Sequence, residues 1–229
     1  IIPFSEYKEL RQLMEAGEPV CITFEMGQPI EKESEEKVVE VKIPEKKEDK
    51  GKAAEIENEI IPEKSSFLFC ELVQKARMGE VSKISGQKCS PGDYVLGLSE
   101  KSPAAYYLSS GRYMNVQAAE KAVLSLPRLK KRFTFIKIEP LSLNSGNFDV
   151  LILFLKPEKA MRIVQANAYS EGKRAVVDTM GAASICGDCT VLALEKGIGL
   201  SFGCKGSRKH SEYEDFEVPL GLSFEKVRE

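Results

Sequence analysis

The segment from Phe148 to Leu155 is the part of this sequence that most constrains the fold. It reads FDVLILFL, so one acidic residue is followed by six apolar residues in an unbroken run. A half-exposed strand alternates apolar and polar side chains, whereas a strand that is covered on both faces is apolar throughout. The segment therefore predicts a central strand of a sheet, with other elements packed on both sides of it.

Strand and helix patterns alternate along the rest of the chain. We predict further strands at 20–24, 94–98, 133–138, 175–177 and 198–202, helices at 5–17, 67–79, 116–126, 157–169 and 184–194, and a short strand with a closing helix in 216–227. Asn115 and Pro157 are residue types that commonly begin helices. This alternation predicts one α/β (α+β-like) domain over residues 1–229, with a mixed β-sheet flanked by helices.

Residues 31–64 differ sharply in composition from the rest of the chain. They contain twelve acidic residues and eight lysines but no aromatic residue. Such a segment cannot bury enough apolar surface to offset the entropy lost on ordering. Within it, β-branched residues alternate with Lys and Glu at 38–43, a pattern that favours an edge strand. We interpret 31–64 as a mobile charged insertion into the domain.

The overall charge excludes several classes of function. The chain has 33 Lys and Arg against 35 Asp and Glu, so its formal net charge is −2 and it has no basic field to attract nucleic acid. No apolar run approaches the roughly 20 residues that a membrane-spanning helix needs. The first residues lack the pattern of a signal peptide, so we expect a cytoplasmic location. Nothing in the sequence sets the oligomeric state or names a partner.

Six cysteines are the residues around which a function could be built. In a cytoplasmic protein, thiols serve in metal, redox or catalytic sites or as small buried hydrophobes more often than in disulfides. Cys186 and Cys189 have the spacing of a redox dithiol, and nearby Lys205 and Arg208 would stabilise a Cys204 thiolate. Simple packing is the alternative, most plainly for Cys21 within an apolar strand.

The turn at 203–208 suggests a different kind of site. Backbone N–H groups at Gly203 and Gly206, together with the Arg208 side chain, could hold a phosphate or a carboxylate. The motif is neither a P-loop nor a dinucleotide-binding fingerprint, so it favours an anionic small molecule without naming one. His210, the only histidine of the chain, lies in a Lys-His-Ser-Glu context, and we interpret it as an exposed surface residue.

Several short motifs follow one another in a specific order along the chain. They are Cys70-Glu71-Leu72-Val73, Cys89-x-x-Gly92 with Leu96-Gly97-Leu98, Glu139-Pro140-Leu141, Asp149-Val150, Lys156-Pro157-Glu158, Gly181-Ala182-Ala183 with Cys186, and Gly203-Cys204-Lys205-Gly206-Ser207-Arg208. In this order they resemble the domain-of-unknown-function family 169, which is found in archaea and bacteria, many of them anaerobes. The resemblance covers Ser5 to Val227 apart from the charged insertion, and it implies no established reaction, substrate or cofactor.

The resemblance does imply that Cys70, Cys89, Cys186 and Cys204 are positions shared by the family, whereas Cys21 and Cys189 belong to this sequence. Four thiolates suit an iron–sulfur cluster such as [4Fe–4S], or a tetrahedral zinc ion. Their spacing is more dispersed than in a ferredoxin or a zinc ribbon. We therefore predict a metal or cluster site at these four cysteines, with the anion site and the Cys186–Cys189 dithiol as alternative hypotheses. Disulfides pairing Cys186 with Cys204, or Cys70 with Cys89, are a further possibility.

Overall fold

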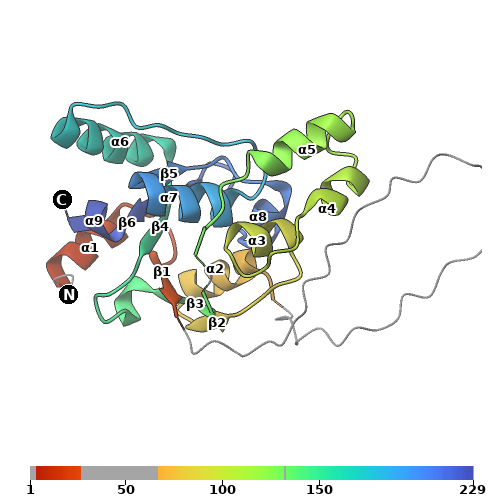
Figure 1. Cartoon of the computed structure of the whole chain (residues 1–229). Helices are drawn as coiled ribbons and strands as arrows, with labels where there is room; N and C mark the ends of the chain where they lie inside the picture. Colours follow the sequence, from red (N-terminus) through yellow and green to blue (C-terminus); the bar gives the residue numbers. More distant parts are fainter. Residues whose placement is uncertain (1–3, 27–66, 132, 229) are drawn as a thin grey trace, which may run out of the picture.

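The computed structural model of the protein describes residues 4–26, 67–131 and 133–228 (Figure 1). The predicted charged insertion at 31–64, and the edge strand predicted inside it at 38–43, lie outside the described residues. The rest forms a single α/β domain, as the alternation of strand and helix patterns predicts.

Six strands form one open sheet in the order β2-β3-β1-β4-β6-β5. The strands are β1 Val20–Glu25, β2 Ser82–Ile84, β3 Phe135–Pro140, β4 Val150–Leu155, β5 Ile198–Leu200 and β6 Val218–Ser223. β4 lies between β1 and β6, and all of its residues are buried. The central strand predicted from the apolar run is therefore confirmed.

The prediction of a mixed sheet was wrong, because all the paired strands of this sheet run antiparallel. The pairings imply that β1 and β2 point the same way with β3 between them, and that β4 and β5 point the same way with β6 between them. The helix-containing connections from β1 to β2 and from β4 to β5 thus join strands of equal direction that are not neighbours, whereas those from β2 to β3 and from β5 to β6 join antiparallel neighbours. An alternation of strands and helices therefore determines neither the relative direction of the connected strands nor which strands are neighbours.

Nine α-helices, a 3₁₀ turn and a π-helix accompany the sheet in the described residues. They are α1 Phe4–Gln12, α2 Phe69–Arg77, α3 Ser90–Val95, α4 Ala104–Ser109, α5 Val116–Leu124, η1 Leu141–Leu143 (3₁₀), α6 Pro157–Glu171, η2 Ser184–Val191 (π), α7 Leu192–Lys196, α8 Lys205–His210 and α9 Phe224–Arg228. Two predicted helix starts are confirmed: α6 begins at Pro157, and the Asn115 side chain accepts a 2.8 Å hydrogen bond from the backbone N–H of Ala118. Among these helices, none is long and apolar enough to cross a membrane.

Two of the predicted strands were wrong. Residues 94–98 fall at the end of α3 and the turn after it, and residues 175–177 have no regular structure. Pro91 lies in the first turn of α3, where a residue without an N–H is tolerated, and the extended Cys89 before it is the N-cap. A five-residue apolar run fits a buried helical turn as well as a strand, so its periodicity could not decide between them.

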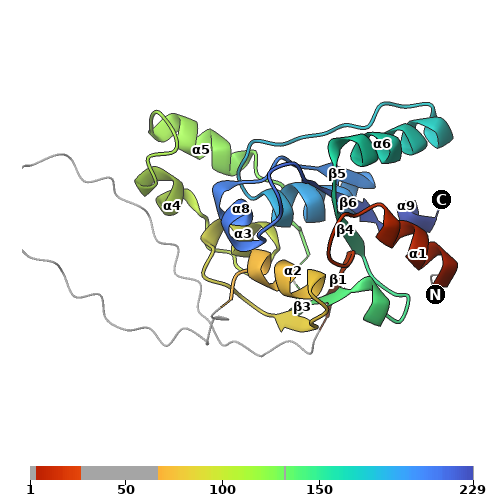
Figure 2. The same cartoon turned by 180° about the vertical axis from the view of Figure 1, so that it is seen from behind.

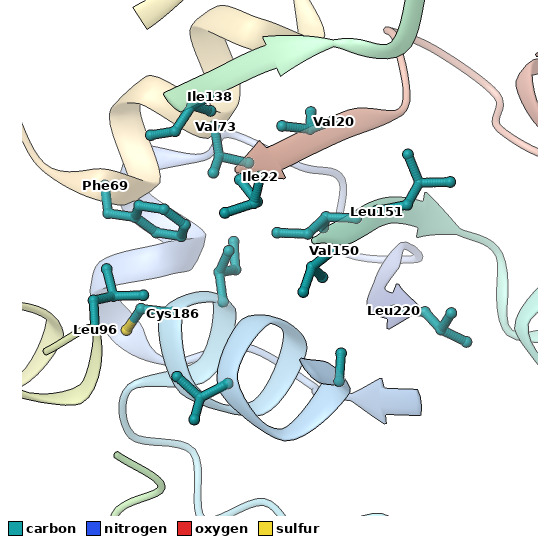
Figure 3. Packing of buried hydrophobic residues seen from close by; sticks show 14 of the residues in the cluster. Val20, Ile22, Phe69, Val73, Leu96, Ile138, Val150, Leu151, Cys186 and Leu220 are labelled. Atoms are coloured by element: carbon teal, nitrogen blue, oxygen red, sulfur yellow. The ribbon is translucent and has the colours of Figure 1, made fainter. Parts of the chain in front are cut away.

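The core lies between the sheet and the helices that cover it. In Figure 3, side chains of β1 and β4 meet Phe69 and Val73 of α2 on one side of a common apolar cluster, and Cys186 of η2 reaches toward the same region. α2 contacts β1 and β3, while η2 and α7 contact β5 and β6. In both views α4 and α5 form one end of the domain, beside α3 and α8 (Figures 1 and 2).

Glycines in the strands let η2 lie directly against the sheet. A Cβ atom on Gly221 of β6 would lie 1.8 Å from the carbonyl oxygen of Cys189, and one on Gly199 of β5 would lie 2.0 Å from that of Asp188. Only glycine allows two backbones to approach this closely. The position of η2, and of the two cysteines that it carries, therefore depends on Gly199 and Gly221.

Candidate functional site

Four cysteines from four different elements line one cavity. Cys70 is in the first turn of α2, Cys89 is the N-cap of α3, Cys186 is in η2 and Cys204 is the N-cap of α8. The cavity has a volume of about 60 Å³. Since one water needs about 10–15 Å³ on the same measure, this hollow has room for several atoms of that size. The structure thus brings together the four cysteines that the sequence analysis grouped.

Gln87 ties the start of α2 to the start of α3. Its side-chain carbonyl accepts a 2.9 Å hydrogen bond from the backbone N–H of Phe69, while its own backbone N–H donates to Asp93 Oδ1 at 2.9 Å. Both contacts are buried. Because they lie next to Cys70 in α2 and within a few residues of Cys89, they hold these two thiols on the same wall of the cavity.

Asp188 joins the segments that carry the other two cysteines. Its Oδ2 accepts hydrogen bonds from Thr179 Oγ1 at 2.6 Å and from Ser201 Oγ at 2.7 Å. Thr179 precedes η2 and Ser201 precedes Cys204. One buried carboxylate therefore connects the segment that leads into η2 with the segment that leads to Cys204. Burial raises the pKa of Asp188 to about 6, and the two hydroxyl donors oppose that rise.

The backbone around Cys204 is arranged to stabilise a thiolate. The N–H of Ser207 donates to Cys204 Sγ at 3.3 Å. Burial alone would raise the pKa of this thiol, but hydrogen bonds from the N–H groups of Ser184, Ser207 and Gly206 lower it below its ordinary value. The donor from Ser184 follows Ala183, which adopts the left-handed conformation (φ 51°) uncommon for a residue with a side chain. Backbone strain is therefore found where the chain aims an N–H at a sulfur.

The other three thiols of the cavity are held mainly as neutral groups. Burial raises the pKa of Cys70 and of Cys186 well above the ordinary value, and it raises that of Cys89 as well. Negative charge on neighbouring cavity thiols adds to each of these rises, so the four groups are close enough to interact electrostatically. Several thiolates in this cavity would repel one another unless a cation lay between them.

A histidine and an arginine also border the cavity. His210 lines the wall, and its Nδ1 lies 2.9 Å from Glu71 Oε1. The sequence-based interpretation of His210 as an exposed surface residue was therefore wrong: α8 was not predicted, and its turn places His210 on the face of Gly206. Arg112 also lines the cavity, with its guanidinium 5.3 Å from the ring centre of Tyr106.

Only part of the predicted anion-binding turn reaches this cavity. Gly206 lines it, whereas Gly203 packs against Tyr213, whose hydroxyl would lie 1.8 Å from an added Cβ. Arg208 donates from Nε and from a terminal nitrogen to the carbonyl oxygen of Phe202, at 3.0 and 2.9 Å. Its Nη1 also lies 3.5 Å from Asp215 Oδ1, so Arg208 is engaged in contacts with neighbouring parts of the chain.

Cys186 and Cys189 face different surroundings in η2. Cys186 lines the cavity, but Cys189 Sγ donates to the carbonyl oxygen of Pro219 in β6 at 3.3 Å. Cys21 is buried in β1. All six cysteines lie in the described part of the chain and all are free thiols, so neither candidate disulfide is formed.

The thiols surround a shared hollow instead of meeting at one point. In the ranges 4–26, 67–131 and 133–228, no three His, Cys, Asp or Glu side chains come close enough to hold a single metal ion. Gln87 and Tyr107 are among the wall residues that the sequence did not predict. Neither lies in a recognisable motif, and Tyr107 comes from α4, which was not predicted.

Comparisons with known proteins agree with the resemblance noted in the sequence. The sequence model of DUF169, described as "Uncharacterised ArCR", matches residues 18–229. The curated relative "Uncharacterized protein MJ0308" of Methanocaldococcus jannaschii is 27% identical over 169 residues, which cover 70% of this chain and 72% of that protein. No solved structure matches the chain significantly. With the family match extending over nearly all the described elements, this chain belongs to the DUF169 family.

Proposed function

We propose that this protein binds an iron–sulfur cluster, most simply a [4Fe–4S] cluster, through Cys70, Cys89, Cys186 and Cys204. The observation that supports this proposal most strongly is the presence of four thiols, from four separate elements, on the wall of one cavity. A [4Fe–4S] cluster takes four cysteine thiolates. Each thiolate binds a different iron, so the sulfurs need to surround a hollow and do not converge on one atom.

The donors around the cavity fit such a group. Backbone N–H groups of Ser184, Gly206 and Ser207 are directed at Cys204, and that of Gly92 is directed at Cys89. Hydrogen bonds to ligand sulfurs stabilise their negative charge and tune a cluster's reduction potential. A bound cluster would supply one-electron transfer, and the largely apolar wall would limit the access of water to it.

Zinc is the closest competitor for the same ligands. In a structural zinc site the four sulfurs lie about 2.3 Å from one ion and leave no hollow between them. Here the thiols line a cavity of about 60 Å³, which favours a larger group. The other two hypotheses have less support, because Cys189 faces away from the cavity and Arg208 is engaged with Phe202.

Metal analysis of the anaerobically purified protein tests the proposal. We expect iron and acid-labile sulfide in near-stoichiometric amounts, with the broad visible absorption of a cluster. Serine at any one of the four cavity positions should lower both contents severely. Cys21→Ser and Cys189→Ser are controls, because these thiols are buried at least as deeply as the cavity thiols but lie outside the cavity, and they should retain the cluster.

Three results would contradict the proposal. One is wild-type protein that holds neither iron nor sulfide after anaerobic reconstitution. Another is loss of the cluster in the control variants to the same extent as in the cavity variants. Stoichiometric zinc with no sulfide would instead assign the four thiols to a mononuclear site.

A further inference from the structure

Two buried hydrogen-bond donors on the cavity wall have no partner among the described residues. They are the side-chain nitrogen Nε2 of Gln87 and the hydroxyl of Tyr107. Both side chains are about 1% exposed. A buried polar group without a partner is unfavourable and rare in folded proteins, so each one calls for an explanation.

The orientation of Gln87 is fixed by its other contacts. Its Oε1 is used by the N–H of Phe69, and this leaves Nε2 as the end without a partner. The missing side chain of Gly92 makes room for it, since a Cβ there would lie 2.7 Å from Nε2. Gln87 and Gly92 therefore together leave an N–H₂ group without a partner on the wall that also carries Cys89.

The position of Tyr107 is also set by its contacts in the fold. Its ring stacks edge-on against Tyr113, with centroids 5.4 Å apart and an interplanar angle of 88°. Burial raises its pKa, and negative charge on Tyr113, Cys186 and Cys89 would raise it further. The hydroxyl therefore keeps its proton and remains a donor close to two of the four thiols.

We propose that Tyr107 and Gln87 donate hydrogen bonds to the sulfur acceptors of the group bound by the four cavity thiols, and thereby raise its reduction potential. This inference rests on the proposed iron–sulfur cluster. A cluster gains negative charge when it is reduced, and a donor aimed at its sulfurs stabilises that charge. The sulfur atoms of the bound group would then be the acceptors that the two donors lack among the described residues.

Tyr107→Phe removes only the hydroxyl and so tests this idea directly. In protein loaded with the cluster, we expect the midpoint potential to shift to a lower value in a dye-mediated redox titration followed by the visible absorption. Tyr94→Phe is the matched control, because Tyr94 is in α3 but not on the cavity wall. It should leave the potential unchanged.

The metal-free protein gives a second and independent test. Removing a buried hydroxyl that has no partner should leave the melting temperature of the metal-free protein unchanged or raise it slightly. The same substitution should lower the melting temperature of the loaded protein, because there the hydroxyl has an acceptor. Gln87→Glu extends the test, since it retains the acceptor for Phe69 and replaces the N–H₂ group by an oxygen that should repel the cluster and lower its occupancy.

The outcomes separate this inference from the proposed function. Wild-type protein without iron and sulfide would overturn the proposed function and this inference with it. A loaded Tyr107→Phe variant with an unchanged potential would overturn only the inference. So would a Tyr107→Phe variant whose metal-free form melts at a clearly lower temperature, because that result would mean that the hydroxyl already has a partner.

Discussion

The middle of the sheet and the wall of the cavity are both buried, but they are built in opposite ways. β4 contributes six apolar side chains in succession, all of them buried, and it contains no polar side chain. Around the cavity, the chain instead places thiols and unpartnered donors, and three α-helices (α2, α3 and α8) and the π-helix η2 begin there. π-helices and strained residues are frequent at functional sites. If the cavity binds a cluster as we propose, the sheet supplies stability and the cavity wall gives up part of it to bind that ligand.

The contact between the sheet and η2 is the place where these two regions depend on each other, and we expect the largest effect there. In Gly221→Ala the new methyl would overlap the carbonyl oxygen of Cys189. We expect a loss of about 3 kcal/mol or more in the free energy of unfolding, measured with urea, because backbone atoms cannot move aside as a side chain can. Gly206→Ala is the control: its Cβ would lie 3.8 Å from the Cys204 sulfur, an ordinary contact, so stability should change by less than about 1 kcal/mol. Equal losses in both variants would refute the account of η2 packing.

A truncation in β4 should reduce stability without changing the cavity. Leu153 is fully buried, and Leu153→Ala should lower the free energy of unfolding by about 2–5 kcal/mol because it leaves a void in the central strand. The folded fraction should still take up iron and sulfide at the wild-type ratio. Unchanged stability in Leu153→Ala would contradict the stabilising role assigned to β4. A variant that folds but loses the cluster would show that the sheet and the cavity are not independent.

The sequence predicts the two regions unequally well, for physical reasons. The central strand and α6 follow from local patterns, an apolar run and a proline at a helix start. A helix was predicted at 184–194, but its π form and its close approach to Gly199 and Gly221 were not, because both depend on packing against the sheet. α8 has only six residues, too few for a local period to reveal it. The four cavity cysteines were grouped from the resemblance and not from their spacing. Tyr107 comes from another six-residue helix, and only the folded chain shows where its hydroxyl lies.

Asp149, which directly precedes β4 and is not on the cavity wall, offers a pH-dependent test of the sheet. Its Oδ2 accepts a 2.7 Å hydrogen bond from the N–H of Phe24, yet burial raises its pKa above the ordinary value. The folded protein therefore binds this proton more tightly than the unfolded chain does. Ionisation of Asp149 therefore lowers the free energy of unfolding as the pH rises from about 4 through its raised pKa. In Asp149→Asn, urea unfolding at several pH values should show a smaller decline over this window. A steeper decline in the variant would contradict the assigned direction.

The smallest change in stability should accompany the largest change in binding, and the Cys204→Ser variant tests this. Serine retains the size of the side chain and can still accept a hydrogen bond from the N–H of Ser207, as serine commonly does at a helix N-cap. We therefore expect the free energy of unfolding of the metal-free protein to change by less than about 1 kcal/mol. Iron and sulfide contents should nevertheless fall sharply, because a serine oxygen is a poor ligand for a site that favours soft sulfur. Cys189→Ser should show the reverse: a greater loss of stability, because Cys189 is completely buried against β6, with the cluster retained. If the two variants lost stability and metal in parallel, the cavity thiols would be ordinary packing residues, and the division between a stabilising sheet and a ligand-binding cavity would not hold.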